Sequence, residues 1–457
     1  MKNKAELLVP AGSIDKLKTA FMYGADAVYM GLPDFSMRVQ SQISLEDLVY
    51  GIEYAHSLGK KVYLTLNLFT HNRDIARLPA LIDTVKKANP DGVLISDPAV
   101  FMYVKEHAPE IPLHISTQAN ICSYMSVDFW KQQGASLCVL ARELSFEELK
   151  EIRAKCPDIR LETFVHGSMC MSYSGRCLLS NFMSGRSANQ GNCSHSCRWN
   201  YKLHMKLKDK EDLEITEANK DLFEFLLEEG VREGEFMPVE ELENGAYILN
   251  SKDLCLMPKL DKYLDLGIDT LKLEGRNKNI YYLATVTRAY RQAIDDYYAD
   301  SENWNAEKYM PDLWTVSNRG YTLGFYNGQI TDYGHNYDNN RSLSQWEFAG
   351  YVTEIDNEYI TVAVKNRIFA EQKLEFITPQ SNIAKTFGKF INAKNNEWIT
   401  EVHSGGTKPM IKIPVSDFSA EEIAEIAPFT IIRREKSIRE DEANRIKNDR
   451  KRYGEEI

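Results

Sequence analysis

The stretch ELLVPAGSIDKLKTAFMYGADAVYMG, residues 6–31, shows the unit from which the first two thirds of the chain are built. A short apolar run is followed by a glycine turn, an amphipathic helical stretch and a second apolar run. Continuous apolar runs that alternate with helices of about ten to fifteen residues are typical of parallel strands buried on both faces. The unit therefore predicts two parallel strands joined by a helix.

The same unit recurs along the chain. The apolar runs are AELLVP, DAVYMG, KVYLTLNLF, GVLIS, PLHIS, SLCVLA, RLETFVHG, AYILNS and DTLKLEGRN. Nine runs for about eight positions predict an α/β fold, a (β/α)8 TIM-like barrel over residues 1–300 with one spare run. The pattern does not say which run is the spare. No GxGxxG or GxxxxGK[ST] follows the first glycine turn, so nucleotide binding has no support.

Three parts of the chain do not follow the alternation of strands and helices. A cysteine-rich insertion, about residues 167–244, leaves from the end of a strand, where a barrel carries its active-site loops. A connector over residues 301–344 leads to alternating strands over residues 345–432, which predict a small antiparallel β-barrel domain for docking or for structure alone. Residues 433–457 form a charged helical tail, either solvated or in contact with phosphate.

Composition places limits on the class of protein. The 457 residues are 43% hydrophobic and 26% charged, and no apolar run is long enough to span a bilayer. The first residues lack the pattern of a signal peptide, so we expect a cytoplasmic protein without a membrane partner. The net charge of −11 gives no overall attraction to a polyanion, although it does not exclude RNA.

Four cysteines lie in one 28-residue window: Cys170, Cys177, Cys193 and Cys197. Cytosolic thiols are kept reduced, which favours metal or cluster ligands over disulfides. The spacing C-x6-C-x15-C-x3-C, on a glycine-rich segment, favours an iron-sulfur cluster over zinc, and leaves zinc open. Cys255 is an alternative for one of the ligands.

Polar residues at strand ends are candidates for a binding site. His166 and Glu162 lie on one strand, and with Arg176 they are our candidate catalytic residues. Planar and cationic groups at a barrel mouth suit an anionic ligand. The candidate substrate-binding residues are Gln118, Asn120, Arg186, Arg198, Lys272 and Arg276. No HExxH or GxSxG pattern supports a peptidase.

The stretch ETFVHGSMCMSYSGRCLLSNFMSGRSANQGNCSHSCRWNY, residues 162–201, resembles the signature of the peptidase U32 family. The opening stretch, LNSKDLCLM, LKLEGRNKNIYY and SNRGYTLGF are similar to other blocks of that family, in the same order. The resemblance covers nearly the whole chain, and the branch that it is most similar to is that of the prephenate-dependent tRNA uridine hydroxylases.

This resemblance implies a function and a cofactor. The function is conversion of the wobble uridine of tRNA to 5-hydroxyuridine, with the dicarboxylate prephenate as co-substrate and a bacterial origin. The cofactor is an iron-sulfur cluster, [4Fe-4S] in type, on the four clustered cysteines. The alternatives are a U32-type, collagenase-like peptidase and an iron-sulfur partner protein in another hydroxylation pathway. A paired subunit or a homo-oligomer is left open.

Overall fold

The computed structural model describes most of the chain. It covers residues 4–32, 43–170, 172–173, 176–184, 193–198, 251–328, 330, 334, 342–405 and 409–457, and short strands between 204 and 246.

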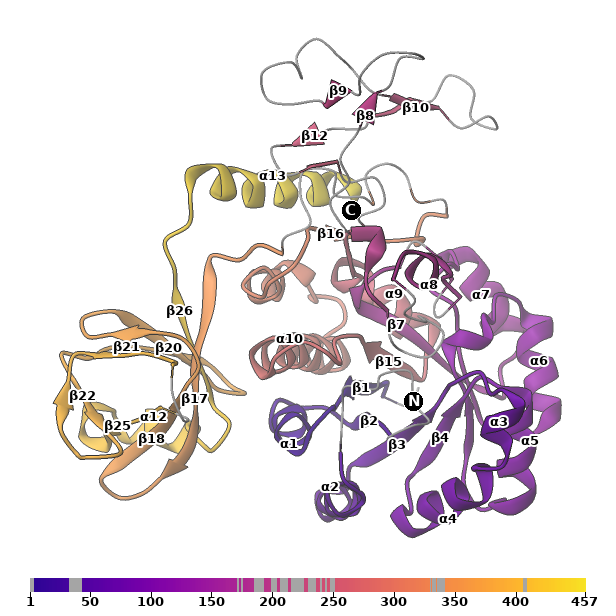
Figure 1. The fold of residues 1–457 in the computed structure, drawn as a ribbon, viewed down its shortest axis with the longest axis horizontal. Helices are drawn as coiled ribbons and strands as arrows, with labels where there is room; N and C mark the ends of the chain where they lie inside the picture. Colours follow the sequence, from indigo (N-terminus) through magenta and orange to yellow (C-terminus); the bar gives the residue numbers. More distant parts are fainter. Residues whose placement is uncertain are drawn as a thin grey trace.

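Eight parallel strands close into a barrel, as the repeated unit predicts (Figure 1). Strands β1 to β7 are neighbours in chain order, and β15 pairs in parallel with both β7 and β1, which closes the ring. The first seven apolar runs supply β1 to β7, and DTLKLEGRN supplies β15, so AYILNS is the spare. The strands are β1 (Glu6–Pro10), β2 (Ala27–Gly31), β3 (Lys61–Leu66), β4 (Gly92–Ile95), β5 (Leu113–Ile115), β6 (Leu137–Val139), β7 (Arg160–Ser168) and β15 (Thr270–Leu273).

Helices surround the barrel, and side-chain caps set where several of them begin. Ser13 and Ser145, for example, accept hydrogen bonds from the first-turn amides of Lys16 and Glu148. The helices are α1 (Ile14–Met22), α2 (Leu45–Ser57), α3 (Asn72–Ile75), α4 (Leu78–Ala88), α5 (Pro98–His107), α6 (Tyr124–Gln133), α7 (Phe146–Lys155), α9 (Leu260–Leu266), α10 (Ile280–Ala299) and α11 (Met310–Leu313). No helix of the described residues has the length and apolar character needed to cross a membrane.

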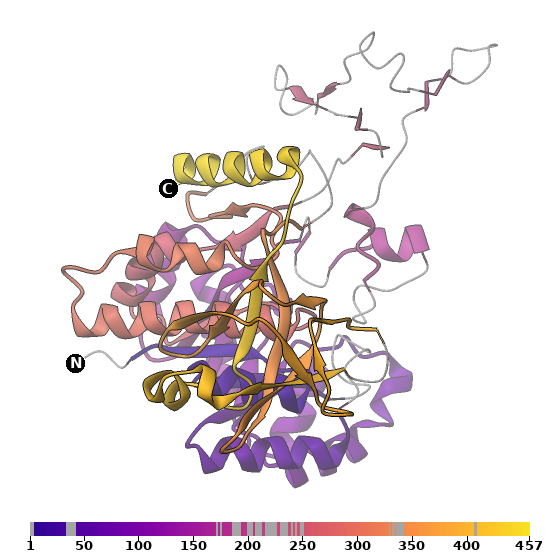
Figure 2. The same cartoon turned by 90° about the vertical axis from the view of Figure 1, so that its left-hand side faces the viewer.

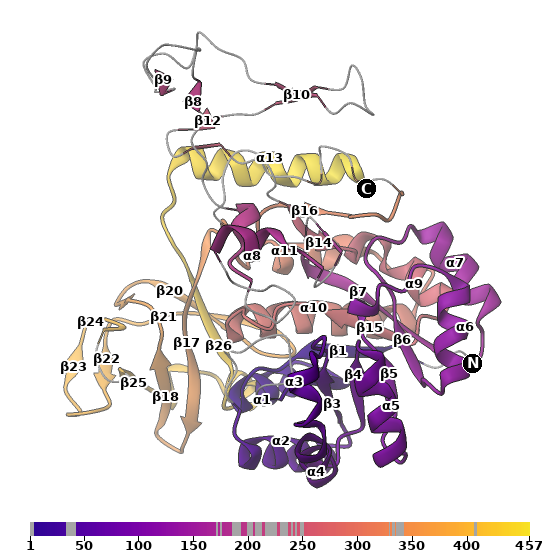
Figure 3. The same ribbon diagram turned by 45° about the vertical axis from the view of Figure 1, so that its right-hand side comes forward.

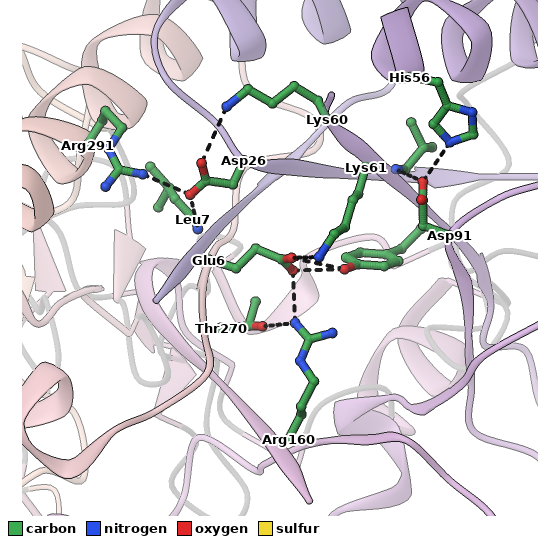
Figure 4. A network of polar contacts seen from close by, with 12 residues as sticks. Glu6, Leu7, Asp26, His56, Lys60, Lys61, Asp91, Arg160, Thr270 and Arg291 are labelled. Carbon is green, nitrogen blue, oxygen red and sulfur yellow. Dashed lines mark hydrogen bonds and ion pairs between the residues drawn. The ribbon is translucent and has the colours of Figure 1, made fainter. Parts of the chain in front are cut away.

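A polar network fills the amino end of the barrel (Figure 4). Glu6 accepts hydrogen bonds from Lys61 at 2.8 Å, from Arg160 at 3.3 Å and from the Tyr63 hydroxyl at 3.0 Å. Burial, reinforced by the charge of Glu6, raises the pKa of Tyr63 above its usual value. This end of a parallel barrel serves stability, so we assign the network a structural role.

Several short elements extend the carboxyl end of the barrel. Strand β14 (Asp253–Cys255) pairs antiparallel with the end of β7, and β16 (Tyr321–Thr322) pairs with β14. The cysteine-rich insertion begins there and includes α8 (Leu179–Ser184) and the short helix η3 (Ser196–Arg198). Its described strands are β8 (His204–Met205), β9 (Leu213–Glu214), β10 (Leu226–Glu228), β11 (Phe236–Pro238), β12 (Glu241–Leu242) and β13 (Gly245–Ala246).

A separate antiparallel sheet, strongly curled, forms the second domain (Figure 2). It has its own apolar core, built around buried residues such as Phe376 and Phe390. Its strands are β17 (Trp346–Ile355), β18 (Tyr359–Val364), β20 (Lys373–Ile377), β21 (Asn382–Thr386), β22 (Phe390–Asn392), β23 (Trp398–Ile399), β25 (Met410–Pro414) and β26 (Ile431–Glu435), with β19 (Ile368–Phe369), β24 (Glu401–Val402) and helix α12 (Ala420–Glu425) beside them.

Buried hydrogen bonds join the second domain to the barrel. The Tyr23 hydroxyl, at the end of α1, donates to Ile377 O at 2.5 Å and accepts from Ile431 N at 3.1 Å. Arg288 on α10 donates to Thr378 O at 2.8 Å. After β26 the chain returns to the barrel as helix α13 (Glu440–Glu456), which lies beside β16 along the side of the barrel (Figure 3).

Candidate functional site at the carboxyl end of the barrel

The centre of the barrel holds a buried ion pair between Lys272 on β15 and Glu162 on β7. Lys272 Nζ donates to Glu162 Oε1 at 2.6 Å, and the two side chains are 5% and 0% exposed. The ammonium also lies 4.5 Å from the centre of the Tyr29 ring and 5.3 Å from that of Phe164. A cation over aromatic faces is stabilised by the ring electrons. Lys272 is therefore held in the barrel interior by one carboxylate and two rings.

Burial shifts both titrating groups of this pair toward their neutral forms. It raises the pKa of Glu162, against the opposing charge of Lys272, and it lowers the pKa of Lys272, against the opposing charge of Glu162. Both shifts narrow the gap between the two pKa values, so proton transfer within the pair is easier than it would be in water. Glu162 Oε2 is buried and has no hydrogen-bond partner among the described residues. The pair thus offers an acceptor atom for a ligand.

Arginines lie above this pair, at the mouth of the barrel. Arg142 follows β6, and its guanidinium carbon stands 3.9 Å from the centre of the Phe164 ring. Arg142 donates to Ser168 O at 2.6 Å, and its charge helps to lower the pKa of Lys272. Sequence analysis missed Arg142, although it follows an apolar run as the other candidates do. Its place after SLCVLA was the available signal.

Arg176 brings the cysteine-rich insertion over the mouth. Its guanidinium donates to Gln118 O at 3.2 Å and lies 4.7 Å from the centre of the Phe69 ring. Gln118 follows β5 and Phe69 follows β3, so the insertion, which leaves from β7, reaches the opposite side of the barrel. Arg176 is adjacent in sequence to Cys177. Arg176 therefore holds the cysteine segment against the barrel mouth.

Three of the other polar candidates also lie at this end. The Gln118 side chain accepts a hydrogen bond from Ser96 at 3.4 Å, at the end of β4. Asn120 adopts a left-handed conformation with φ of 52°, and its Oδ1 is buried with no hydrogen-bond partner in the described part of the chain. Arg276, in the loop after β15, is 7% exposed, and its carbonyl accepts from Lys16 at 2.8 Å. These residues line the rim of the mouth.

His166 occupies a different environment from Glu162. Its ring packs against Tyr282, Tyr290 and Tyr321, with ring centres 6.0, 5.5 and 5.4 Å apart, and it is 1% exposed. Burial lowers its pKa to about 4. The structure therefore places His166 in an aromatic core beside α10, while Glu162 faces Lys272. It does not bring the two together as one acid–base pair.

A contact between two serines links the two described parts of the cysteine segment. Ser180 on α8 accepts a hydrogen bond from Ser194 N at 2.9 Å, and the two hydroxyl oxygens are 3.0 Å apart. This contact links the stretch after Cys177 to the stretch between Cys193 and Cys197. Cys170 is exposed, two residues beyond the end of β7, and the other three thiols are half-buried.

The donors of this segment fit a thiolate-held group such as an iron-sulfur cluster. Four thiols lie at one end of the barrel, and His195 N donates to Cys193 Sγ at 3.4 Å, the kind of amide–sulfur contact that tunes such clusters. Among the described side chains, no three or more His, Cys, Asp or Glu residues are grouped closely enough to hold a metal ion. The sulfur atoms of Cys170, Cys177, Cys193 and Cys197 would therefore have to move closer together to hold such a cluster.

Three sequence candidates remain. Arg186 lies outside the described residues, and so does the side chain of Arg198. Cys255, on β14 opposite His166, is fully buried, and burial raises the pKa of its thiol to about 11. A buried thiol of this kind is a core residue, not a ready ligand.

Comparisons with known proteins agree with this architecture. The family model described as "Peptidase family U32" matches residues 12–336, and that of the "Peptidase family U32 C-terminal domain" matches residues 344–427. Tested against curated proteins, the chain is 40% identical over 409 residues to tRNA hydroxylation protein P of Escherichia coli, covering 86% of this chain and 90% of that protein.

Two further relatives have related names. The identity to tRNA hydroxylation protein P1 of Bacillus subtilis is 34%, over 86% of this chain and 88% of that protein. The identity to a 23S rRNA 5-hydroxycytidine synthase of Escherichia coli is 29%, over 79% of this chain and 51% of that protein.

Proposed function

Because the chain belongs to the peptidase U32 family, we propose that it is an RNA hydroxylase that converts the wobble uridine of tRNA to 5-hydroxyuridine, with prephenate as co-substrate. The names of its relatives support RNA hydroxylation as the reaction class. The choice of uridine, its position and the co-substrate go beyond those names.

The observation that carries the proposal is the cationic and aromatic lining of the barrel mouth. Lys272, Arg142 and Arg176 each lie over an aromatic ring, at 4.5, 3.9 and 4.7 Å from its centre. Guanidinium groups bind carboxylates through paired hydrogen bonds, and aromatic faces stack on planar rings. A dicarboxylate that carries an unsaturated ring matches both features. Prephenate belongs to that chemical class.

The Glu162–Lys272 pair supplies the proton chemistry in this proposal. Lys272 keeps the buried Glu162 carboxyl in place below the mouth, and Glu162 Oε2 has no hydrogen-bond partner among the described residues. Because burial raises the pKa of Glu162 and lowers that of Lys272, moving a proton from the ammonium to the carboxylate costs less than it would in water. Arg142 and Arg176 orient the ligand from the rim.

We assign the iron-sulfur cluster to Cys170, Cys177, Cys193 and Cys197. Bound there, it would supply an electron carrier close to the mouth. Arg176 makes this assignment relevant to the reaction, since it contacts Gln118 at the rim and is adjacent to Cys177.

One arrangement expected of a cysteine peptidase does not fit the described residues. A cysteine peptidase needs a thiolate beside an imidazolium, and Cys255 lies opposite His166 on paired strands. Burial, however, raises the pKa of this thiol to about 11 and lowers that of the imidazole to about 4, so both groups are neutral. Neither is accessible to a polypeptide, because both are at most 1% exposed.

Nucleoside analysis tests the reaction. The chain is expressed in bacteria that lack their own hydroxylation proteins, and the tRNA is digested and analysed by mass spectrometry. We expect 5-hydroxyuridine in cells that make prephenate, and a large loss of it in cells that do not. Arg142→Ala should lower the yield strongly, whereas Lys61→Ala, at the amino end, should not. Prephenate-independent hydroxylation would contradict the co-substrate assignment, and absence of 5-hydroxyuridine would contradict the reaction.

Cofactor analysis tests the cluster separately. Protein purified without oxygen should contain about four iron and four sulfide per chain and absorb broadly near ~400 nm, as expected for a [4Fe-4S] cluster. Cys193→Ala should lose iron, and Cys122→Ala, a half-buried thiol outside the segment, should keep it. Zinc in place of iron, or unchanged iron in Cys193→Ala, would show that the ligand assignment is wrong.

A further inference from the structure

The carboxyl-terminal helix α13 presents a strip of cations to solvent. Between residues 445 and 452 there are five Lys or Arg residues and one acidic residue, in a chain of net charge −11. Lys447, Lys451 and Arg452 are exposed, while Ile446 and Tyr453 are buried. Lys447 and Lys451 are four residues apart and so share one face of the helix.

Buried contacts fix the orientation of this helix. Tyr453 is 2% exposed and packs against Trp314 and Tyr321, with ring centres 6.0 Å from each. Glu456 accepts hydrogen bonds from the Thr322 hydroxyl at 2.9 Å and from Leu323 N at 3.0 Å. The apolar side of α13 is therefore bound to the β16 region, where Arg450 also lies over Trp314, and the exposed Lys447, Lys451 and Arg452 face solvent.

Strand pairing connects the region that α13 covers to the candidate site. Strand β16 pairs with β14, and β14 pairs with residues 166–168 at the end of β7, immediately before Cys170. Figures 1 and 3 show α13 next to β16, along the side of the barrel. A large substrate bound over the barrel mouth would thus lie within reach of the helix.

Packing within the protein does not account for the strip. Among the residues that the structure describes, Lys447 and Arg452 have no ion-pair or hydrogen-bond partner, and Lys451 contacts Glu455 only at 3.8 Å. Like charges four residues apart destabilise a helix slightly. The strip is also beyond the last residue, 427, that the family models match. A ligand of opposite charge would offset the repulsion.

We propose that α13 is a docking surface for the phosphate backbone of the RNA substrate. The inference rests on the proposed function and names the surface that holds the large part of that substrate. Lys447 to Arg452 span about 8 Å along the helix axis. One strand of a duplex carries a phosphate every ~3.4 Å, so this length matches roughly two or three phosphates. The small co-substrate site inside the barrel is distinct from this surface.

The test is tRNA binding as a function of salt. Unmodified tRNA is titrated with wild-type protein and with the triple variant Lys447→Gln, Lys451→Gln, Arg452→Gln between 50 and 200 mM KCl. Three lost phosphate contacts should reduce the slope of log K against log salt by about 2 to 3. In hydroxylation assays KM for tRNA should rise with little change in kcat.

A matched control removes two exposed lysines elsewhere, Lys86→Gln and Lys87→Gln on α4, and should leave the slope unchanged. Thermal unfolding of the triple variant should match wild type, because the buried Ile446 and Tyr453 are kept. The variant Lys447→Glu, Lys451→Glu, Arg452→Glu provides a second test and should bind tRNA still more weakly than the glutamine variant.

The outcomes separate the two proposals. If wild-type protein hydroxylates tRNA and the triple variant binds tRNA with an unchanged salt slope, the docking inference is overturned. The same result is expected if the strip binds an acidic protein instead of RNA, so that alternative also overturns the inference. If the slope falls as expected and no hydroxylation occurs in any sample, the docking surface stands and the proposed reaction fails.

Discussion

Removing the buried amine of Lys272 should destabilise the barrel strongly. In Lys272→Met the Glu162 carboxyl, which is 0% exposed, loses its ion pair at 2.6 Å. Its second oxygen has no hydrogen-bond partner in the described part of the structure to compensate. Breaking a buried pair by removing one partner typically lowers the free energy of unfolding by about 3–5 kcal/mol. We expect a loss in that range at pH 7.

The loss should depend on pH in a known direction. Burial raises the pKa of Glu162, and without Lys272 the main opposing effect is gone. A carboxyl whose folded-state pKa is above its unfolded value stabilises the fold below the unfolded pKa and loses that stability as pH rises through the folded pKa. The destabilisation of Lys272→Met should therefore be larger at pH 8 than at pH 5.

Two matched variants test the reasoning by urea unfolding. The double variant Glu162→Gln, Lys272→Met removes both charges and should recover most of the loss. Lys61→Met removes a half-exposed partner of Glu6, which keeps Arg160 and Tyr63, so it should cost less than about 1 kcal/mol. If Lys272→Met is no worse than Lys61→Met, or if the double variant is as unstable as the single one, the buried pair is not the cause.

Two further predictions concern stability. Tyr23→Phe leaves Ile377 O and Ile431 N without their buried hydrogen-bond partner. The free energy of unfolding, measured by denaturant titration, should therefore fall by about 1–3 kcal/mol. An unchanged denaturation midpoint would mean that water replaces the hydroxyl. The pKa of His166 is lowered to about 4, so between that pH and about 6.5 the unfolded state binds the extra proton. Stability should fall by about 2 kcal/mol from pH 7 to pH 5 through this residue, and His166→Gln should remove that part of the loss.

Much of the site could be predicted from strand ends. Gln118 and Lys272 were identified because polar residues that follow buried parallel strands meet at one end of a barrel, and Arg176 because it lies in the cysteine-rich insertion; the structure brings Arg176 to Gln118 and buries Lys272 against Glu162. Arg142 satisfies the same rule and was overlooked. His166 also lies at the end of a strand, as that rule requires. A register shift between Lys272 and Leu273 alters the strand pairing next to it, however, and its ring packs against tyrosines such as Tyr290. Local pattern does not reveal such a shift.

The sequence by itself determined the barrel class, the curled antiparallel domain and the concentration of cysteines after the seventh strand. These depend on local periodicity and residue type, which a single chain displays directly. Only the tertiary structure decided that Lys272 pairs with Glu162, that Arg176 crosses the mouth to Gln118, and that Tyr453 of α13 donates to Cys255 O. Each of these contacts joins residues at least 58 positions apart in the sequence. Which distant side chains meet is set by the closure of the barrel and by the return of the chain from the second domain to the barrel, and the local sequence pattern does not contain that information.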